Sequence, residues 1–205
     1  MVLRRIFEGR TISKFYVDVG AHHPRRFSNT YFFYQQGWSG INIDAMPGSM
    51  SLFEAERQRD INLEMPVAKK QAALTYTQFN EPALNSFSEE LVLARTSLPS
   101  VKVIATQKME AYPLAKILDQ HLPSGQEIAF LSIDVEGLDL QVLQSNDWQK
   151  YRPNVVLVEI QKSSLHKIQS EPIYQYMLEH RYYLYAKAFH TAFFTSEEYW
   201  ERFLR

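Results

Sequence analysis

The sequence predicts an α/β fold, with a doubly wound, mostly parallel sheet covered by helices on both faces. Two strand-like runs, at 14–19 and 127–137, are apolar on both faces, which is typical of parallel strands buried between helices. A strand, a helix and a second strand follow one another between residues 14 and 44, as in a βαβ unit. The length of 205 residues suits one domain, and we expect a single domain over 1–205.

The first half of the chain supplies the βαβ unit and the elements after it. The run KFYVDV at 14–19 is the first strand, and residues 1–13 form an N-terminal segment before it. Ser28 or Asn29 can cap a helix over 30–36, which ends at Gly37, a favourable residue after a helix. The following elements are expected as a strand at 39–44, a helix at 50–58, and strands at 60–68 and 73–79.

The second half begins with a segment of weak periodicity. Residues 80–100 have a proline near each end, and we expect an irregular insertion or lid there, since long loops are commonly functional or mobile. Pro113 suits the first position of a helix that continues to Leu122. The remaining elements are expected as a strand at 127–137, a helix at 138–145, a strand at 154–160, a helix at 172–180, and two strands within 182–195 that turn near 189–190.

Composition excludes several classes of protein. Lys plus Arg (22) nearly balances Asp plus Glu (23), so no long-range field attracts nucleic acid or an acidic membrane. The absence of cysteine excludes disulfides, thiolate nucleophiles and cysteine-ligated metal centres. The charged N-terminus is unlike a secretory signal, and no stretch approaches the ~20 apolar residues of a membrane span. We expect a cytoplasmic protein that binds neither nucleic acid nor a membrane; the sequence indicates no oligomeric state.

Acidic residues stand at the ends of four predicted strands. They are Asp18, Asp44, Asp134 with Glu136, and Glu159. In an open parallel sheet, ligands bind outside the carboxyl ends of the strands. Any one of these acids can instead cap a helix or a turn. Together they favour a ligand that is rich in hydroxyl and amino groups.

The turn after the first strand separates the classes of nucleotide. It reads DVGAHHP, with one glycine where a dinucleotide fold has G-x-G-x-x-G, so a dinucleotide oxidoreductase is disfavoured. Asp18 would repel a pyrophosphate and attract an ammonium group. S-adenosylmethionine fits this pattern, with its ammonium near the first turn, its ribose diol near Asp44 and its sulfonium among carboxylates. Asp44 lies 26 residues after Asp18, a little beyond the ~20-residue spacing typical of ribose-binding acids.

Several blocks of the sequence resemble one known family. FYVDVGAHHPRRFSNTYFFYQQGWSGINIDAMP, then RDIN, FLSIDVEGLDLQVL and RPNVVLVEI, resemble the FkbM family of S-adenosylmethionine-dependent methyltransferases, roughly over residues 14–195. The resemblance implies a class I methyltransferase fold, a Rossmann-like, seven-stranded, mostly parallel sheet with an antiparallel C-terminal hairpin. It also implies O-methylation of a small-molecule or glycan acceptor, commonly a sugar or a polyketide-type secondary metabolite.

Carried over position by position, the family motifs give a set of cofactor-binding residues. The set is Asp18, Gly20, Ala21, Ser28, Asn29, Thr30, Asp44 and Asp134. Many relatives have Glu at the position of Asp44. Asp60, in the RDIN block, either accepts a hydrogen bond from the adenine amine or stabilises the preceding turn, and Asn62 is a weaker candidate of the same kind.

The catalytic candidates are Glu136, Asp134 and His22. An acceptor hydroxyl must lose its proton, so a base within hydrogen-bonding reach assists the transfer. Asp134 and Glu136 point the same way on an extended strand, so that Asp134 meets the methionine moiety and Glu136 the acceptor. His22 is the better of two adjacent histidines, because the other is expected to pack against or cap the turn. Glu136 can alternatively cap the next helix.

Two alternative functions remain open at this point. Asp134, Glu136 and Glu159 offer the oxygen ligands of a divalent cation, so a metal-assisted O-methyltransferase is possible, although we expect no metal. A non-catalytic module that binds adenosylmethionine or a nucleoside would carry the same cofactor motifs. Turnover, rather than binding, separates the enzyme from such a module.

Overall fold

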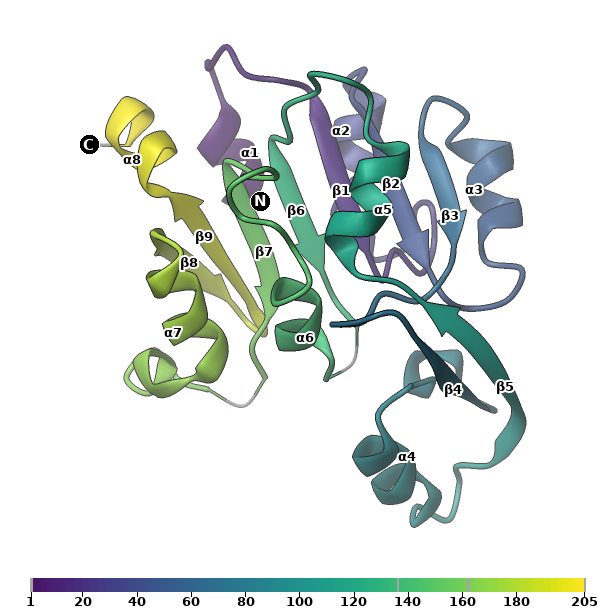
Figure 1. The fold of residues 1–205 in the computed structure, drawn as a ribbon. Helices are drawn as coiled ribbons and strands as arrows, with labels where there is room; N and C mark the ends of the chain where they lie inside the picture. The colour runs from purple at the N-terminus through teal and green to yellow at the C-terminus, as the bar shows by residue number, and fades with distance from the viewer. Residues whose placement is uncertain (1, 136, 162, 205) are drawn as a thin grey trace.

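The computed structural model describes residues 2–135, 137–161 and 163–204. Its main sheet consists of β1 Phe15–Val19, β2 Ser39–Asp44, β3 Ile61–Glu64, β6 Phe130–Ile133, β7 Val155–Glu159, β8 Tyr182–Ala188 and β9 Thr191–Ser196. These seven strands are ordered β3-β2-β1-β6-β7-β9-β8 (Figure 1). The order reverses between β1 and β6, which is the point where open α/β sheets bind ligands.

Strands β3, β2, β1, β6 and β7 are parallel to one another, and β9 alone in this sheet runs against them. Asp18 of β1 lies opposite Asn42 of β2 and Ser132 of β6, so the carboxyl ends of these three strands meet at one edge. β9 pairs antiparallel with both β7 and β8. This sheet confirms the expected seven-stranded, mostly parallel fold with an antiparallel C-terminal hairpin.

Helices cover both faces of the sheet, as strands apolar on both faces require. They are α1 Val2–Phe7, α2 Tyr31–Gln35, α3 Met50–Glu56, α5 Leu114–His121, α6 Asp139–Leu143, α7 Pro172–Glu179 and α8 Glu197–Phe203, with a 3₁₀ turn at Ile168–Ser170. One apolar core contains Ile117 of α5, Val142 of α6 and Met177 of α7. A second core, on the opposite face, contains Phe33 of α2 and Tyr199 of α8.

Helix α1 lies in the segment 1–13, for which the sequence analysis expected no regular element. Leu3, Ile6 and Phe7 recur at the spacing of one helix face and are buried in the second core. The ring of Phe7 stacks at 6.0 Å on that of Phe130 in β6. The spacing of these apolar residues could therefore have predicted the helix, although only its packing against the core makes so short a helix stable.

A projecting unit, called the arm here, comprises residues 72–111. Strands β4 Ala72–Phe79 and β5 Val103–Ala111 pair antiparallel and enclose a 3₁₀ turn at Pro82–Leu84 and helix α4 Glu89–Thr96. Figure 1 shows the arm beyond the edge of the main sheet toward which β2 and β6 point. The expectation of an irregular segment at 80–100 is wrong in this respect, since Ser88 caps a regular helix there. Strand β5 was also missed, because nearly all of its residues are exposed and no burial pattern marks it.

The other elements lie within a few residues of their expected bounds. Helix α5 begins at Leu114, so Pro113 occupies the capping position before the helix rather than its first residue. Among the residues described, no helix combines the length and the apolar character that crossing a membrane requires.

Candidate active site

A cleft of about 360 Å³ opens at the carboxyl ends of β1, β2, β3 and β6. This volume is within the range of small-molecule sites, ~300–1,000 Å³. The main sheet and its loops contribute most of the walls, and the arm contributes one further wall. The arm residues are Tyr76, Glu81, Pro82, Asn85, Ser86 and Phe87. The cleft therefore lies where the strand-end acids of the sequence analysis predicted a ligand.

The turn after β1 depends on Gly20. Its φ is +82°, and a Cβ on it would lie 1.8 Å from the backbone oxygen of Asp134. The N–H groups of Gly20 and Ala21 donate to the carbonyl of Ile43 at 2.9 and 3.1 Å. The turn is thus fixed between the ends of β2 and β6, and only glycine allows so close an approach.

Asp18 is a buried acid at the floor of the cleft. It is 4% exposed, and burial raises the pKa of its carboxyl to about 6. The Thr30 hydroxyl donates to its Oδ2 at 3.3 Å, and a hydrogen bond from Ser132 also stabilises the ionised form. A cationic group in the cleft would shift this carboxyl further toward its ionised form.

Asp44 links the two loops that form the upper wall. Its Oδ2 accepts the N–H of His22 at 2.8 Å, and its Oδ1 accepts the N–H of Met46 at 2.7 Å. Burial raises the pKa of this carboxyl, and the two backbone hydrogen bonds oppose the shift. Each carboxylate oxygen retains a second lone pair, so Asp44 can still accept hydrogen bonds from a diol.

The two histidines of the turn have different environments. Nδ1 of His23 accepts the N–H groups of Arg25 and Arg26 at 3.0 and 3.1 Å, so this ring caps the turn. His22 has a φ of 54°, is exposed and lines the cleft. The location of His22 is compatible with a role as base, and that role stays a prediction.

Of the three polar residues before α2, Ser28 and Asn29 line the cleft and Thr30 does not. Asn29 lines the cleft and donates to the Ser132 hydroxyl at 3.2 Å. Ser28 also lines the cleft, while its Oγ accepts the N–H groups of Thr30 and Tyr31 at 3.2 and 3.1 Å. Thr30 is fully buried and lies outside the cleft lining. The prediction that Thr30 contacts a cofactor directly does not fit this position, because its hydroxyl instead donates to Asp18.

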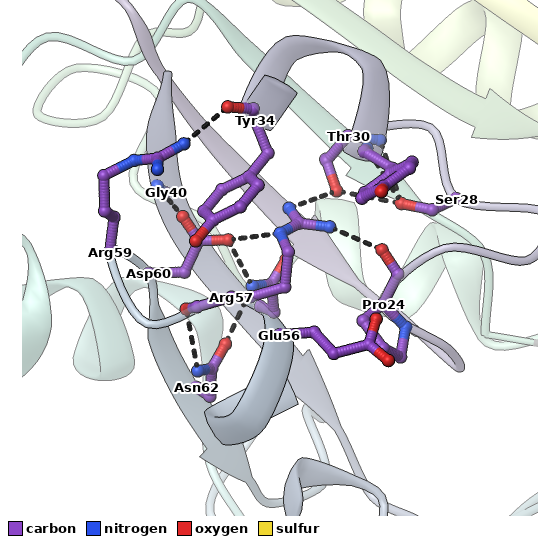
Figure 2. Close-up of polar contacts among 12 residues, drawn as sticks. Pro24, Ser28, Thr30, Tyr34, Gly40, Glu56, Arg57, Arg59, Asp60 and Asn62 are labelled. Carbon is purple, nitrogen blue, oxygen red and sulfur yellow. Dashed lines mark hydrogen bonds and ion pairs between the residues drawn. The ribbon is translucent and has the colours of Figure 1, made fainter. Parts of the chain in front are cut away.

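Asp60 is not brought to the cleft. Its side chain is fully buried and accepts hydrogen bonds from Gly40 N–H, Asn42 Nδ2 and Arg57 Nε, each at 2.9 Å (Figure 2). The Tyr16 hydroxyl donates to it as well, at 2.8 Å. With its oxygens turned into this cluster, Asp60 does not reach an adenine. Of the two predicted roles, the structural one fits the geometry.

The end of β6 carries the remaining predicted acids. Asp134 lines the cleft and is exposed. Glu136 lies outside the described residues, and its role as base stays a prediction. Glu159 ends β7, outside the cleft lining, and accepts a hydrogen bond from Gln161 at 2.8 Å. Within the described ranges, no three His, Asp or Glu side chains are grouped to hold a metal ion.

Three residues of the site escaped the sequence analysis. Asp139, at the start of α6, accepts the N–H groups of Val135 and Gly137 at 3.2 Å each and so shapes the loop after β6. Burial raises the pKa of its carboxyl to about 6. On the arm, the ring of Tyr76 packs 4.7 Å from that of Phe87. Burial raises the pKa of Tyr76 to about 12. The IDVEGLD spacing offered a signal for Asp139, whereas nothing local marked the arm residues.

The sequence was also compared with known proteins. A family model described as the methyltransferase FkbM domain matches residues 18–188. The match begins at Asp18 and includes the whole cleft as well as the arm. No curated protein and no solved structure matches the sequence.

Proposed function

Because this chain belongs to the FkbM methyltransferase family, we propose that it transfers the methyl group of S-adenosylmethionine to a hydroxyl of a sugar or secondary metabolite. The family match supports methyl transfer. The donor and the acceptor are inferred from the chemistry of the cleft.

The observation that carries the proposal is the arrangement of two carboxylates around the Gly20 turn. Asp18 and Asp44 end adjacent parallel strands, β1 and β2, and both line the cleft. The turn between them has no side chain at its closest approach to Asp134. These residues fit S-adenosylmethionine, since a buried carboxylate suits its cationic end and a carboxylate with spare lone pairs suits its ribose diol.

S-adenosylmethionine, when bound, supplies a methyl group activated by a positive sulfonium. In the proposed site, Asp18 attracts the ammonium group and Asp44 accepts hydrogen bonds from the ribose hydroxyls. The arm residues Tyr76 and Phe87 exclude water from the cleft, and alignment with exclusion of water is the main requirement of such a displacement. His22, Asp134 and Glu136 are the candidates to take the proton from the acceptor hydroxyl.

A ring-shaped, hydroxylated acceptor suits the outer part of the cleft. Phe27, which lines the cleft, is 88% exposed and presents a large apolar face to incoming molecules. Glu81 and Asn85, on the arm, add polar groups to the lining of the same cleft. Aromatic faces combined with polar groups are the usual composition of a site for a compound with both apolar and hydroxylated surfaces.

Two measurements test the proposal. Calorimetry with S-adenosylhomocysteine measures binding of the demethylated donor, and release of S-adenosylhomocysteine over a panel of glycans and natural products measures turnover. We expect Glu136→Gln to lower turnover at least ~100-fold with donor affinity intact, because loss of a general base costs about this much. Glu179→Gln, at the exposed end of α7, is the matched control.

The outcomes separate the candidate functions. Absence of binding would refute the proposed donor. Tight binding with no turnover on any acceptor would favour the non-catalytic module instead. Turnover that is abolished by a chelator and restored by Mg²⁺ would favour the metal-assisted reaction.

A further inference from the structure

Arg57, at the end of α3, is a fully buried cation beside the candidate active site. Both Arg57 and its ion-pair partner Asp60 have 0% exposed side chains. Besides Asp60, the guanidinium donates to the Pro24 carbonyl at 2.8 Å and the Thr30 hydroxyl at 3.0 Å (Figure 2). It also donates to the Tyr16 hydroxyl at 2.7 Å. It therefore joins β1, the loop after β1 and the start of α2.

The chemistry of these groups fixes the direction of the hydrogen bonds around Thr30. Arginine has no acceptor, so Thr30 Oγ1 must accept from Arg57. Ser28 Oγ already accepts two backbone N–H groups, so its own hydrogen points to Thr30 Oγ1 at 3.1 Å. With two bonds accepted, Thr30 has one hydrogen left to donate, and the acceptor in reach is Asp18 Oδ2 at 3.3 Å.

We propose that Arg57 is a positioning residue that acts on the donor site through Thr30, by ordering the hydrogen bond that favours the ionised form of Asp18. Through the Pro24 carbonyl, the same guanidinium holds the loop that carries His22. The inference deepens the proposed function and rests on it, because an ionised Asp18 matters for binding a cationic methyl donor. A buried aspartate without such donors would stay neutral.

The groups that face Asp18 come from four parts of the chain. Burial and the charge of Asp44 on β2 favour the neutral form of Asp18. The charge of Arg57 and hydrogen bonds from Thr30 and from Ser132 on β6 favour the ionised form. With all of these in place, burial raises the pKa of Asp18 to about 6. Asp134, at the end of β6, lines the same cleft and adds a further negative group.

The first test is a ¹³C NMR titration of the Asp18 carboxyl in the ligand-free protein, which does not depend on the proposed function. Thr30→Val removes the hydroxyl and keeps the shape, and we expect the titration midpoint to rise by about one pH unit. Thr30→Ser restores the hydroxyl and is expected to restore the midpoint. Thr195→Val is the matched control, since the Thr195 hydroxyl is buried in β9 with no hydrogen-bond partner in the described part of the chain.

Arg57→Lys tests the hydrogen bond from Arg57 to Thr30, the first step of the proposed connection to Asp18. Lysine keeps the charge and can pair with Asp60, but one ammonium group cannot replace the planar fork that reaches Pro24, Tyr16 and Thr30 together. We expect the midpoint of Asp18 to rise in this variant as well. A wild-type midpoint in folded Thr30→Val or folded Arg57→Lys would overturn the proposal, and Thr30→Ala replaces Thr30→Val if valine prevents folding.

The second test is the affinity for S-adenosylhomocysteine as a function of pH. A midpoint one unit higher lowers the ionised fraction of Asp18 about fivefold at pH 6 and hardly at all at pH 8.5. Thr30→Val should therefore bind about fivefold more weakly at pH 6 and almost normally at pH 8.5, a recovery that general loosening of the fold would not give. Equal weakening at both pH values would contradict the inference. If the wild type binds no S-adenosylhomocysteine while the NMR midpoints shift, the proposed function fails and the role of Arg57 stands.

Discussion

Replacement of Gly20 by alanine is expected to abolish donor binding by displacing the turn after β1. A Cβ at this position would lie 1.8 Å from the Asp134 oxygen and 2.8 Å from its carbonyl carbon, so the backbone must move by more than 1 Å. The move breaks the hydrogen bonds of Gly20 and Ala21 to Ile43, worth roughly 1 kcal/mol each. The left-handed φ of +82° adds about 1–2 kcal/mol.

These free-energy costs sum to about 3–4 kcal/mol. The variant either loses this much stability or relieves the clash by displacing the turn. Urea denaturation measures the first and calorimetry with S-adenosylhomocysteine the second, for which we expect at least a ~100-fold loss of affinity. Gly125→Ala is the matched control, since Gly125 has a φ of +72° and nothing within 4 Å of a Cβ, so it carries the strain without the clash. If Gly20→Ala bound the donor normally and lost no more stability than Gly125→Ala, the reasoning on the turn would be refuted.

Three further predictions concern the acids. Burial raises the pKa of Asp18 to about 6 in the folded protein, so its charge is lost as the pH falls through 6. The affinity for S-adenosylhomocysteine should therefore be about tenfold weaker at pH 5 than at pH 8. An affinity that calorimetry finds independent of pH would contradict this. Asp44→Asn keeps one oxygen for the N–H of His22 but loses the charge and the acceptor for the N–H of Met46. Affinity for S-adenosylhomocysteine should fall about tenfold or more, while loss of one hydrogen bond should lower the melting temperature by only a few degrees. A large loss of stability with unchanged affinity would contradict a ligand contact. Asp60→Asn leaves Arg57 buried without its counter-ion, so the free energy of unfolding measured with urea should fall by about 3–5 kcal/mol. A fall of less than ~1 kcal/mol would mean that water reaches the ion pair.

Much of the fold was readable because its signals are local. The apolar runs that became β1 and β6, the glycine after α2 and the C-terminal hairpin all follow from residue order and periodicity. Several site residues were equally accessible. Asp18, Gly20 and Asp44 stand at strand ends, and the ends of adjacent parallel strands always meet at one edge.

The residues that sequence reasoning misplaced are those whose partners are distant along the chain. Asp60 stands in a motif and was a candidate for the cofactor, yet its oxygens accept hydrogen bonds from Tyr16, 44 residues away, and Gly40, 20 residues away. Thr30 was predicted to contact the cofactor, but it lies outside the cleft lining and its hydroxyl donates to Asp18. Strand β5 is exposed along almost its whole length, so only its pairing with β4 identifies it.

The sequence by itself determined the class of fold and the edge of the sheet where chemistry is possible. Strands that are apolar on both faces need helices on both faces, and acids at their ends are costly to bury among apolar side chains, which favours the edge of the sheet for them. Only the tertiary structure decided which acids face the cleft and which, like Asp60, accept hydrogen bonds from buried groups instead. The direction of a polar side chain depends on what packs against it, and here those partners come from strands, loops and the arm, far apart in the chain.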